Sequence, residues 1–446
     1  MAPFGFTPDD GDDAERTNRE NLEAMMRQMQ EQLKAQFEQL GINPVGFVNP
    51  FTSLFPGSAN TSPGGKEEVL SISTARETAK KFVTAQGLKP IGTKELAVVA
   101  SAFEISEIWL DEALSFPATG KAPNSATRSD WVDQTISGWH KTIEPLAAGL
   151  SSAISNLLDQ AMNTQAGEST EGQPPIEMIT MMLRSFIGTM IATQLGQSIG
   201  TLAASVTGAH DVGLSLLDPA HPVVIPENIE NWADELEIPK SEVFIFHALR
   251  ESAVARLFAH NPWLVSYIQS TITEYGRGIR IDLEAIQRQA EEAMNNFDPS
   301  QPLNNQINLN VELNNGIFSP EESPQQKAAL EKLETVLALI DGWSDDVVTT
   351  AAGDRIPNIE QLRETQRRRR ASSTPAQQLF ATLLGLEVSP RLTREASAFW
   401  KAIREEQSMD KRDGLWAGIL PTAEDLKNPS AFISSTEIPD DLSGLL

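Results

Sequence analysis

Apolar residues recur at helical spacing along most of the 446-residue chain, and this pattern constrains the fold more than any other feature. Strong alternation of apolar and polar residues, which marks a half-buried strand, does not occur. The turn-rich stretch 211–226 contains the β-branched residues Val223, Val224 and Ile225. We therefore expect a mainly α fold with at most a short β-hairpin in that stretch. The helical periods cover residues 68–86, 94–114, 130–161, 176–206, 240–259, 262–278, 283–295, 326–350, 359–370, 375–384 and 392–405.

Shifts in composition divide the chain into three parts. Residues 1–66 begin as an acidic stretch, and we expect disorder there apart from one amphipathic helix over residues 17–41. A linker rich in Gly, Pro and Ser, residues 42–66, follows that helix. We expect residues 67–430 to form a single helical domain and residues 431–446 to form a C-terminal tail.

Charge and cysteine content exclude several classes of function. The net charge is −26, because 61 acidic residues outnumber 35 basic ones. Nucleic acids and anionic membrane surfaces bind clustered Lys and Arg, so neither is an expected partner. The chain has no cysteine, which rules out disulfides and thiolate zinc sites. A cysteine-free chain whose N-terminus lacks a charged-then-apolar signal pattern is expected in the cytoplasm.

The most apolar segment, residues 176–206, predicts a buried helix and no membrane insertion. Arg184 and two glutamines interrupt it, and such residues are costly in a bilayer. Gly196 and Gly200 lie one turn apart on one face of this helix. A glycine costs roughly 1 kcal/mol relative to alanine in a helix interior. We therefore expect these two glycines to permit the close approach of another helix.

Residues 250–254 keep one part of a zinc-binding pattern. In the helical motif H-E-x-x-H, two histidines one turn apart bind zinc, and the glutamate between them acts as general base. At those three positions this chain has Arg250, Glu251 and Val254. The glutamate is in place, whereas neither arginine nor valine binds zinc. Glu251 is therefore the candidate catalytic residue of a site whose metal ligands have changed.

Two interpretations are open for Glu251 and for His247, which lies one turn before it. Their i, i+4 spacing places them on one helical face, where they could hold a metal together. An ordinary pair of neighbouring side chains has the same spacing. The apolar residues around Glu251 predict a buried helix, in which a carboxylate needs a partner. Arg250 and Arg256 are the candidates for a structural ion pair with Glu251.

A second cluster of carboxylates, residues 341–346 (DGWSDD), follows the predicted helical stretch 326–340. It could be a capped helix end or a helical face that carries ligands. Asp341 and Asp345 are four residues apart and therefore share a face. They could bind a metal, or they could be two solvated carboxylates. The basic run that follows, residues 367–370, is unusual in an acidic protein. We expect it to contact an acidic surface of the same molecule.

A set of segments spread over residues 67–430 is specific enough to indicate a family. These segments are IWLDEA (108–113), QLGQSIGTLA (194–203), HDVGLSL (210–216), LRESAVARLFAHNPWL (249–264), EYGRGI (274–279), LALIDGWSDDVV (337–348), AAGDRIP (351–357), RRRRASSTPAQQLFATLLGLEVSPR (367–391) and LPTAEDL (420–426). Together they resemble the zincin-like metallopeptidases of actinobacteria, which are described as hydrolases and are related to a group associated with coenzyme F₄₂₀ biosynthesis. The resemblance implies a mostly helical, zincin-like fold.

The resemblance also assigns roles to individual positions. The family's first-helix glutamate falls on Glu251, and the histidine that follows it in the family falls on Val254. The glutamate of the second family segment falls on Asp341. The His-or-Trp position after it falls on Trp343, and the next acidic position falls on Asp345. The resemblance thus implies a site built from the two helices that carry Glu251 and Asp341.

The candidate metal ligands are Asp341, Asp345 and His247, and we expect Trp343 and Arg250 to line the pocket. Carboxylate ligands suit Mg²⁺, Ca²⁺ or Mn²⁺ better than zinc, which usually takes three protein ligands including histidine. The cofactor therefore stays open between none and a divalent metal, and these residues fit zinc poorly.

Two functions of different class follow from these observations. The first is a metal-dependent peptidase or hydrolase that acts on a peptide or protein, with Glu251 polarising a metal-bound water. The second is a catalytically inactive binding or scaffold protein that keeps the fold without the metal. In the second case the amphipathic helix of residues 21–40, tethered by the linker, would dock a protein partner.

Overall fold

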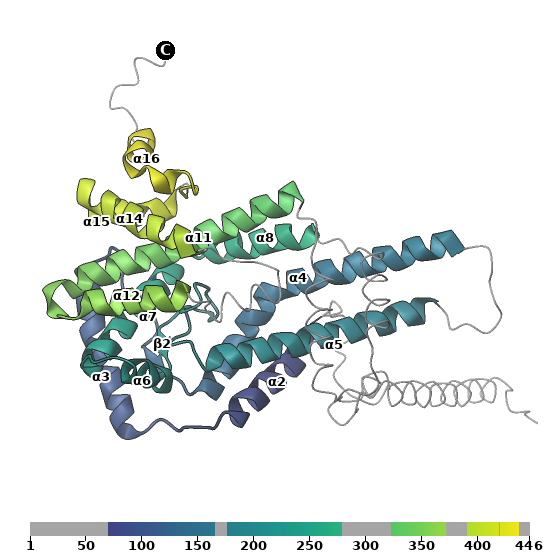
Figure 1. The fold of residues 1–446 in the computed structure, drawn as a ribbon, viewed down its shortest axis with the longest axis horizontal. Coiled ribbons are helices and arrows are strands. Elements are labelled where there is room, and N and C mark those ends of the chain that lie inside the picture. The colour runs from purple at the N-terminus through teal and green to yellow at the C-terminus, as the bar shows by residue number, and fades with distance from the viewer. Residues whose placement is uncertain (1–69, 166–175, 279–322, 372–389, 419, 437–446) are drawn as a thin grey trace, which may run out of the picture. The chain divides into compact units, whose positions relative to one another are not determined.

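Helices dominate the computed structural model, which confirms the mainly α fold class (Figure 1). The structure describes residues 70–165, 176–278, 323–371, 390–418 and 420–436. These residues fall within one unit defined by internal contacts. The helices expected over 17–41, 283–295 and 375–384 lie outside the described residues, as does most of the expected tail.

In the first part of the described chain, two long helices and the first helix pack together. The four helices of this part are α2 (Ile72–Ala85), α3 (Thr93–Asp111), α4 (Arg128–Gln165) and α5 (Ile176–Ala203). Helices α4 and α5 run side by side, and α2 packs against both (Figure 1). A Cβ atom on Gly196 would lie 2.5 Å from the carbonyl oxygen of Ala75, and one on Gly200 would lie 2.7 Å from Cβ of Phe82. The two glycines therefore permit the close approach of α2, as expected.

A short β element joins two distant parts of the chain. Strand β1 (Asn124–Ser125) pairs in parallel with β2 (Val223–Val224). The structure describes no hairpin within residues 211–226; instead an isolated antiparallel bridge joins Val224 to Gly208, which precedes this stretch. The amides of His210 and Val223 donate to the carboxylate of Glu251.

Helix α7 (Lys240–His260) runs through the centre of the molecule and is buried on almost all sides. It packs against α3, against α6 (Pro226–Asp234) and against α11 (Pro324–Ala352). Its neighbour α8 (Trp263–Arg277) begins directly after Asn261-Pro262, the break that the sequence places there. Because α7 has no solvated face along its middle turns, any partner of its polar side chains there must come from inside the protein.

The C-terminal helices are α12 (Ile359–Ala371), α14 (Pro390–Glu406), α15 (Met409–Gly414) and α16 (Pro429–Thr436). Of these, α12 and α14 pack against α11, and α15 and α16 pack against α14. Helix α11 starts with a capping box between Ser323 and Gln326 and continues without a break through residues 341–346. The carboxylate cluster therefore lies within a continuous helix and not at a helix end. Residues 431–436 of the expected tail belong to α16, where Phe432 is buried.

The apolar α5 ends within the body of the protein. Among the described helices, none has the length and apolar character needed to cross a membrane. The described part of α5 places Ala192, Leu195 and Ile199 in the hydrophobic core.

The contact between α2 and α5 gives a first prediction. We expect Gly196→Ala to lower the free energy of unfolding by about 1–3 kcal/mol, because the added methyl group overpacks the contact with Ala75. Gly414→Ala is the control, since a Cβ atom there meets nothing within 4 Å. Its effect should stay within about 1 kcal/mol. Urea unfolding measures both, and a Gly196→Ala variant as stable as the wild type would contradict the close approach.

Candidate functional site

Helix α7 carries the motif residues into the core. Arg250 and Glu251 retain only 8% and 5% of their accessible surface, and Val254 retains 6%. Because both charged side chains are buried among apolar residues, their hydrogen-bond and ion-pair partners determine their chemical reactivity.

Both oxygens of the Glu251 carboxylate accept hydrogen bonds, from one loop and from β2. Its Oε1 accepts hydrogen bonds from the amide of Val223 at 3.0 Å and from the amide of Ala209 at 3.2 Å. His210 donates twice, from its amide to Oε2 at 3.0 Å and from ring Nδ1 to Oε1 at 2.8 Å. A Cβ atom on Gly208 would lie 2.3 Å from Oε2, so a glycine is needed where this loop passes the carboxylate.

The two arginines expected to pair with Glu251 pair with other residues, so that expectation was wrong. Arg250 donates from Nη2 to Oδ1 of Asp341 at 2.6 Å. Arg256 is bound to Glu107 and Asp111 of α3. The physical reason is direction, because successive residues project about 100° apart around a helix. Position 250 therefore faces α11 and position 256 faces α3, while Glu251 faces the loop.

Asp341 joins three helices. Its Oδ1 receives Arg250 from α7 and also Arg370 from α12. Arg370 in addition lies 3.4 Å from Oδ1 of Asp211, whose Oδ2 accepts the amide of Thr207. Burial opposes ionisation of Asp211, but the charge of Arg370 and the Thr207 amide outweigh it and lower the pKa of this carboxyl group. This part of the site is a closed set of paired charges.

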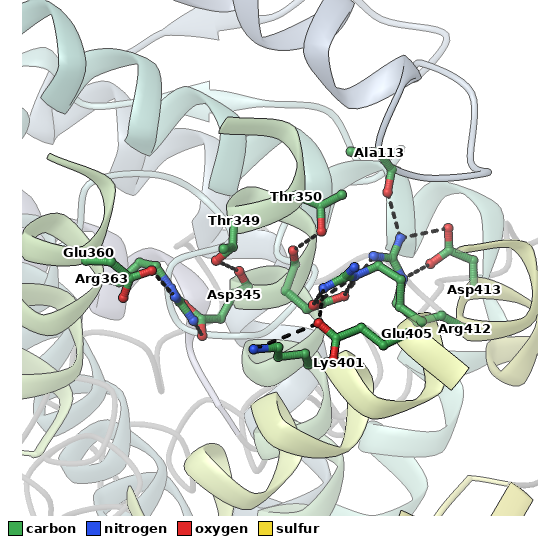
Figure 2. Close-up of polar contacts among 12 residues, drawn as sticks. Ala113, Asp345, Thr349, Thr350, Glu360, Arg363, Lys401, Glu405, Arg412 and Asp413 are labelled. Atoms are coloured by element: carbon green, nitrogen blue, oxygen red, sulfur yellow. Dashed lines mark hydrogen bonds and ion pairs between the residues drawn. The ribbon is translucent and has the colours of Figure 1, made fainter. Parts of the chain in front are cut away.

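Asp345 points to a different face of α11, toward α12 (Figure 2). Arg363 donates two hydrogen bonds to its carboxylate, at 3.0 and 2.8 Å, and Arg367 donates a third at 3.0 Å. Burial alone would raise the pKa of Asp345, but these guanidinium groups lower it to about 2. The basic run therefore does contact an acidic surface of the same molecule, as expected.

Trp343, expected to line the pocket, is fully buried, and its Nε1 donates to Oδ1 of Asp413 at 2.8 Å. Figure 2 shows Arg412 between Asp413 and the carbonyl oxygen of Ala113. Arg412 also binds Asp346 at 2.9 Å, together with Arg404 from α14. These contacts hold α14 and α15 against α11, on the side of that helix away from Glu251.

Some of the candidate residues lie together and line a cavity of about 20 Å³. That space suits one or two water molecules, since one water needs roughly 10–15 Å³ by this measure. Asp345 and Trp343 are not part of the lining. The sequence-predicted residues that line the cavity are His247, Arg250, Glu251 and Asp341, joined by Val254, His210, Asp211 and Arg370.

Two histidines border this cavity, and only His247 was expected there. Its ring meets Trp232 edge-on at 4.7 Å, and its Nε2 has no hydrogen-bond partner among the described residues. Burial lowers its pKa to about 3, with Arg250 adding to the effect and Asp211 opposing it, so the ring is neutral near pH 7. His210, which lies 41 residues before Glu251, was not singled out because no local pattern links the two positions.

A family model described as zincin-like metallopeptidase matches residues 70–433. The chain belongs to this family. Its fold is similar to the crystal structure of a protein from Chloroflexus aurantiacus described as a "putative hydrolase with a novel fold", with a TM-score of 0.55 and 16% sequence identity. The match covers 83% of this chain and all of the other one. A search of curated proteins finds no match.

The zinc ion that the family description implies does not fit these residues. In the described part of the chain, no three His, Cys, Asp or Glu side chains are grouped so that they could hold a metal ion. The oxygens of Glu251 accept four hydrogen bonds, and Asp341 and Asp345 are each bound by two arginines. The metal-ligand roles of Asp341, Asp345 and His247 therefore stay predictions, and they require these contacts to break.

The environment of His247 gives a second prediction. Because its pKa is lower in the folded state than its ordinary value of 6.5, its contribution to stability is complete above pH 6.5 and is lost as the pH falls toward 3. Relative to His247→Gln, the wild type should lose about 1 kcal/mol of unfolding free energy between pH 6.5 and 5.5, because the unfolded chain is already half protonated at this position at pH 6.5.

Urea unfolding at pH 7.5, 6.5 and 5.5 tests this expectation. His221→Gln, at a side chain that is not buried, is the control and should follow the wild type at each pH. Parallel pH dependence of wild type and His247→Gln would show that His247 is not held neutral by burial.

Proposed function

We propose that this family member works in the cytoplasm as a metal-free binding or scaffold protein and not as a metallopeptidase. The observation that carries the proposal is the state of Glu251. A general base needs a free lone pair directed at a water or substrate. Here Oε1 accepts three hydrogen bonds and Oε2 accepts one, and these bonds hold the loop and β2 in place. They support a structural role for Glu251.

The size of the cavity supports the same proposal. The space beside Glu251 has room of about 20 Å³, enough for one or two water molecules. A peptide bond with its flanking side chains would need more room than that. Arg250 and Arg370 further place two cations beside Asp341, where a hydrolytic metal would have to approach.

Peptide hydrolysis is the second candidate, because the family description names metallopeptidases and Glu251 occupies the motif position. In that case Glu251 would leave the loop to polarise a metal-bound water. Asp341, Asp345 and His247 would have to supply the ligands. The two candidates differ in what the protein binds and in what Glu251 contributes.

Glu251→Gln distinguishes the two functions. We expect the variant to lose about 3 kcal/mol of unfolding free energy, because the amide NH₂ group would face backbone N–H donors in place of an acceptor. Glu274→Gln, at a side chain that is 51% exposed, is the control and should change little. Wild-type protein should contain no stoichiometric metal by elemental analysis and should not cleave a peptide library.

The opposite pattern would support the hydrolase. Wild-type protein would then carry about one metal ion per chain and cleave peptides. Glu251→Gln would abolish turnover while leaving the unfolding curve in place. That combination would contradict a structural role for this carboxylate.

A partner-docking role for the helix of residues 21–40 is part of the proposal, although this helix lies outside the described residues. It rests on the amphipathic pattern of residues 21–40 and on the linker of residues 42–66, which is rich in Gly, Pro and Ser.

Deleting residues 1–66 tests this role. We expect the truncated protein to keep the unfolding midpoint of the full chain, because the deleted segment precedes the first described helix. It should lose the partners that the full chain recovers in a pull-down. Unchanged recovery would argue against docking by this segment.

A further inference from the structure

Both histidine positions of the H-E-x-x-H pattern face the same cavity in this chain. Arg250 and Val254 are four residues apart on α7, and both belong to the cavity lining. Asp341 faces them from α11. Two positions on one helical face and a carboxylate opposite them have the arrangement that a metal centre with two histidines and one carboxylate requires.

The charge at the centre of this arrangement comes from arginine. The side chain of Asp341 is 11% exposed, and a carboxylate at that depth needs a cation. Arg250 supplies one at 2.6 Å, and its own side chain is only 9% exposed. Arg370, with 23% exposure, supplies a second from α12 and also pairs with Asp211.

We propose that Arg250 and Arg370 stand in for a metal ion, so that the cavity is a latent divalent-cation site that the two guanidinium groups keep closed. This inference rests on the proposed metal-free function. If the two ligands had only been lost, Asp341 would be unpaired. Here Arg250, which occupies the first ligand position, itself neutralises Asp341. Val254 fills the second ligand position with apolar volume.

Restoring the two histidines tests the inference directly. In Arg250→His/Val254→His, two imidazoles and Asp341 would face one cavity, a ligand set that suits zinc. We expect about one zinc ion per chain after incubation with zinc chloride and dialysis, and an affinity at least about tenfold above that of the wild type. Adding Arg370→Gln should tighten zinc binding further, because it removes the remaining cation.

A matched control keeps the cavity and removes one ligand. Arg250→His/Val254→His/Asp341→Asn should bind zinc at least about tenfold more weakly than the double variant, because two protein ligands remain of three. Equal zinc binding with and without Asp341 would place the metal elsewhere on the protein and overturn the inference. Circular dichroism of each variant shows whether the helical fold is retained.

The remaining outcomes are also decisive. A double variant that folds but binds no zinc, beside a wild type that binds none, overturns the latent site and leaves the proposed function standing. A wild type that binds zinc stoichiometrically overturns the proposed function itself. If the double variant does not fold without metal, zinc added during refolding should restore the helical spectrum, and a failure to restore it counts against the inference.

Discussion

Paired buried charge along α11 is the constraint on which the rest of the structure depends. Asp341, Asp345 and Asp346 are largely buried within six residues, and each is bound by two arginines. Removing one partner from such a pair typically costs several kcal/mol, because the other charge stays buried. The arginines come from α7, α12, α14 and α15, so satisfying the three carboxylates fixes where those helices pack.

The same pairing limits the chemistry that the centre can perform. A catalytic carboxylate is useful when its lone pairs meet a water, a metal or a substrate. Glu251 gives its lone pairs to backbone amides and to His210, and in doing so it holds the loop against β2. Glu251 is thus an internal hydrogen-bond acceptor that ties α7 to this loop and to β2.

Local features of the chain were predictable because they depend on neighbours in sequence. Helical periodicity located α7 and the break at Asn261-Pro262, and the spacing of Gly196 and Gly200 indicated a close helix contact. The short helices α6 and α15 were missed, since fewer than three turns carry too little periodic signal. The parallel pairing of β1 with β2 joins residues about a hundred positions apart, and two-residue strands leave no pattern.

The sequence by itself determined that the protein is helical, that α7 is buried, and that Glu251 sits where a motif glutamate belongs. It also indicated that the basic run, residues 367–370, would contact acidic side chains of the same chain. Only the tertiary structure decided which carboxylate each arginine binds. The long side chain of an arginine binds an acceptor on the helix that it faces, and the packing of the helices determines which helix that is. As a result Arg250 binds Asp341, and Glu251 binds His210 in a loop more than forty residues away. No local sequence pattern encodes either pairing.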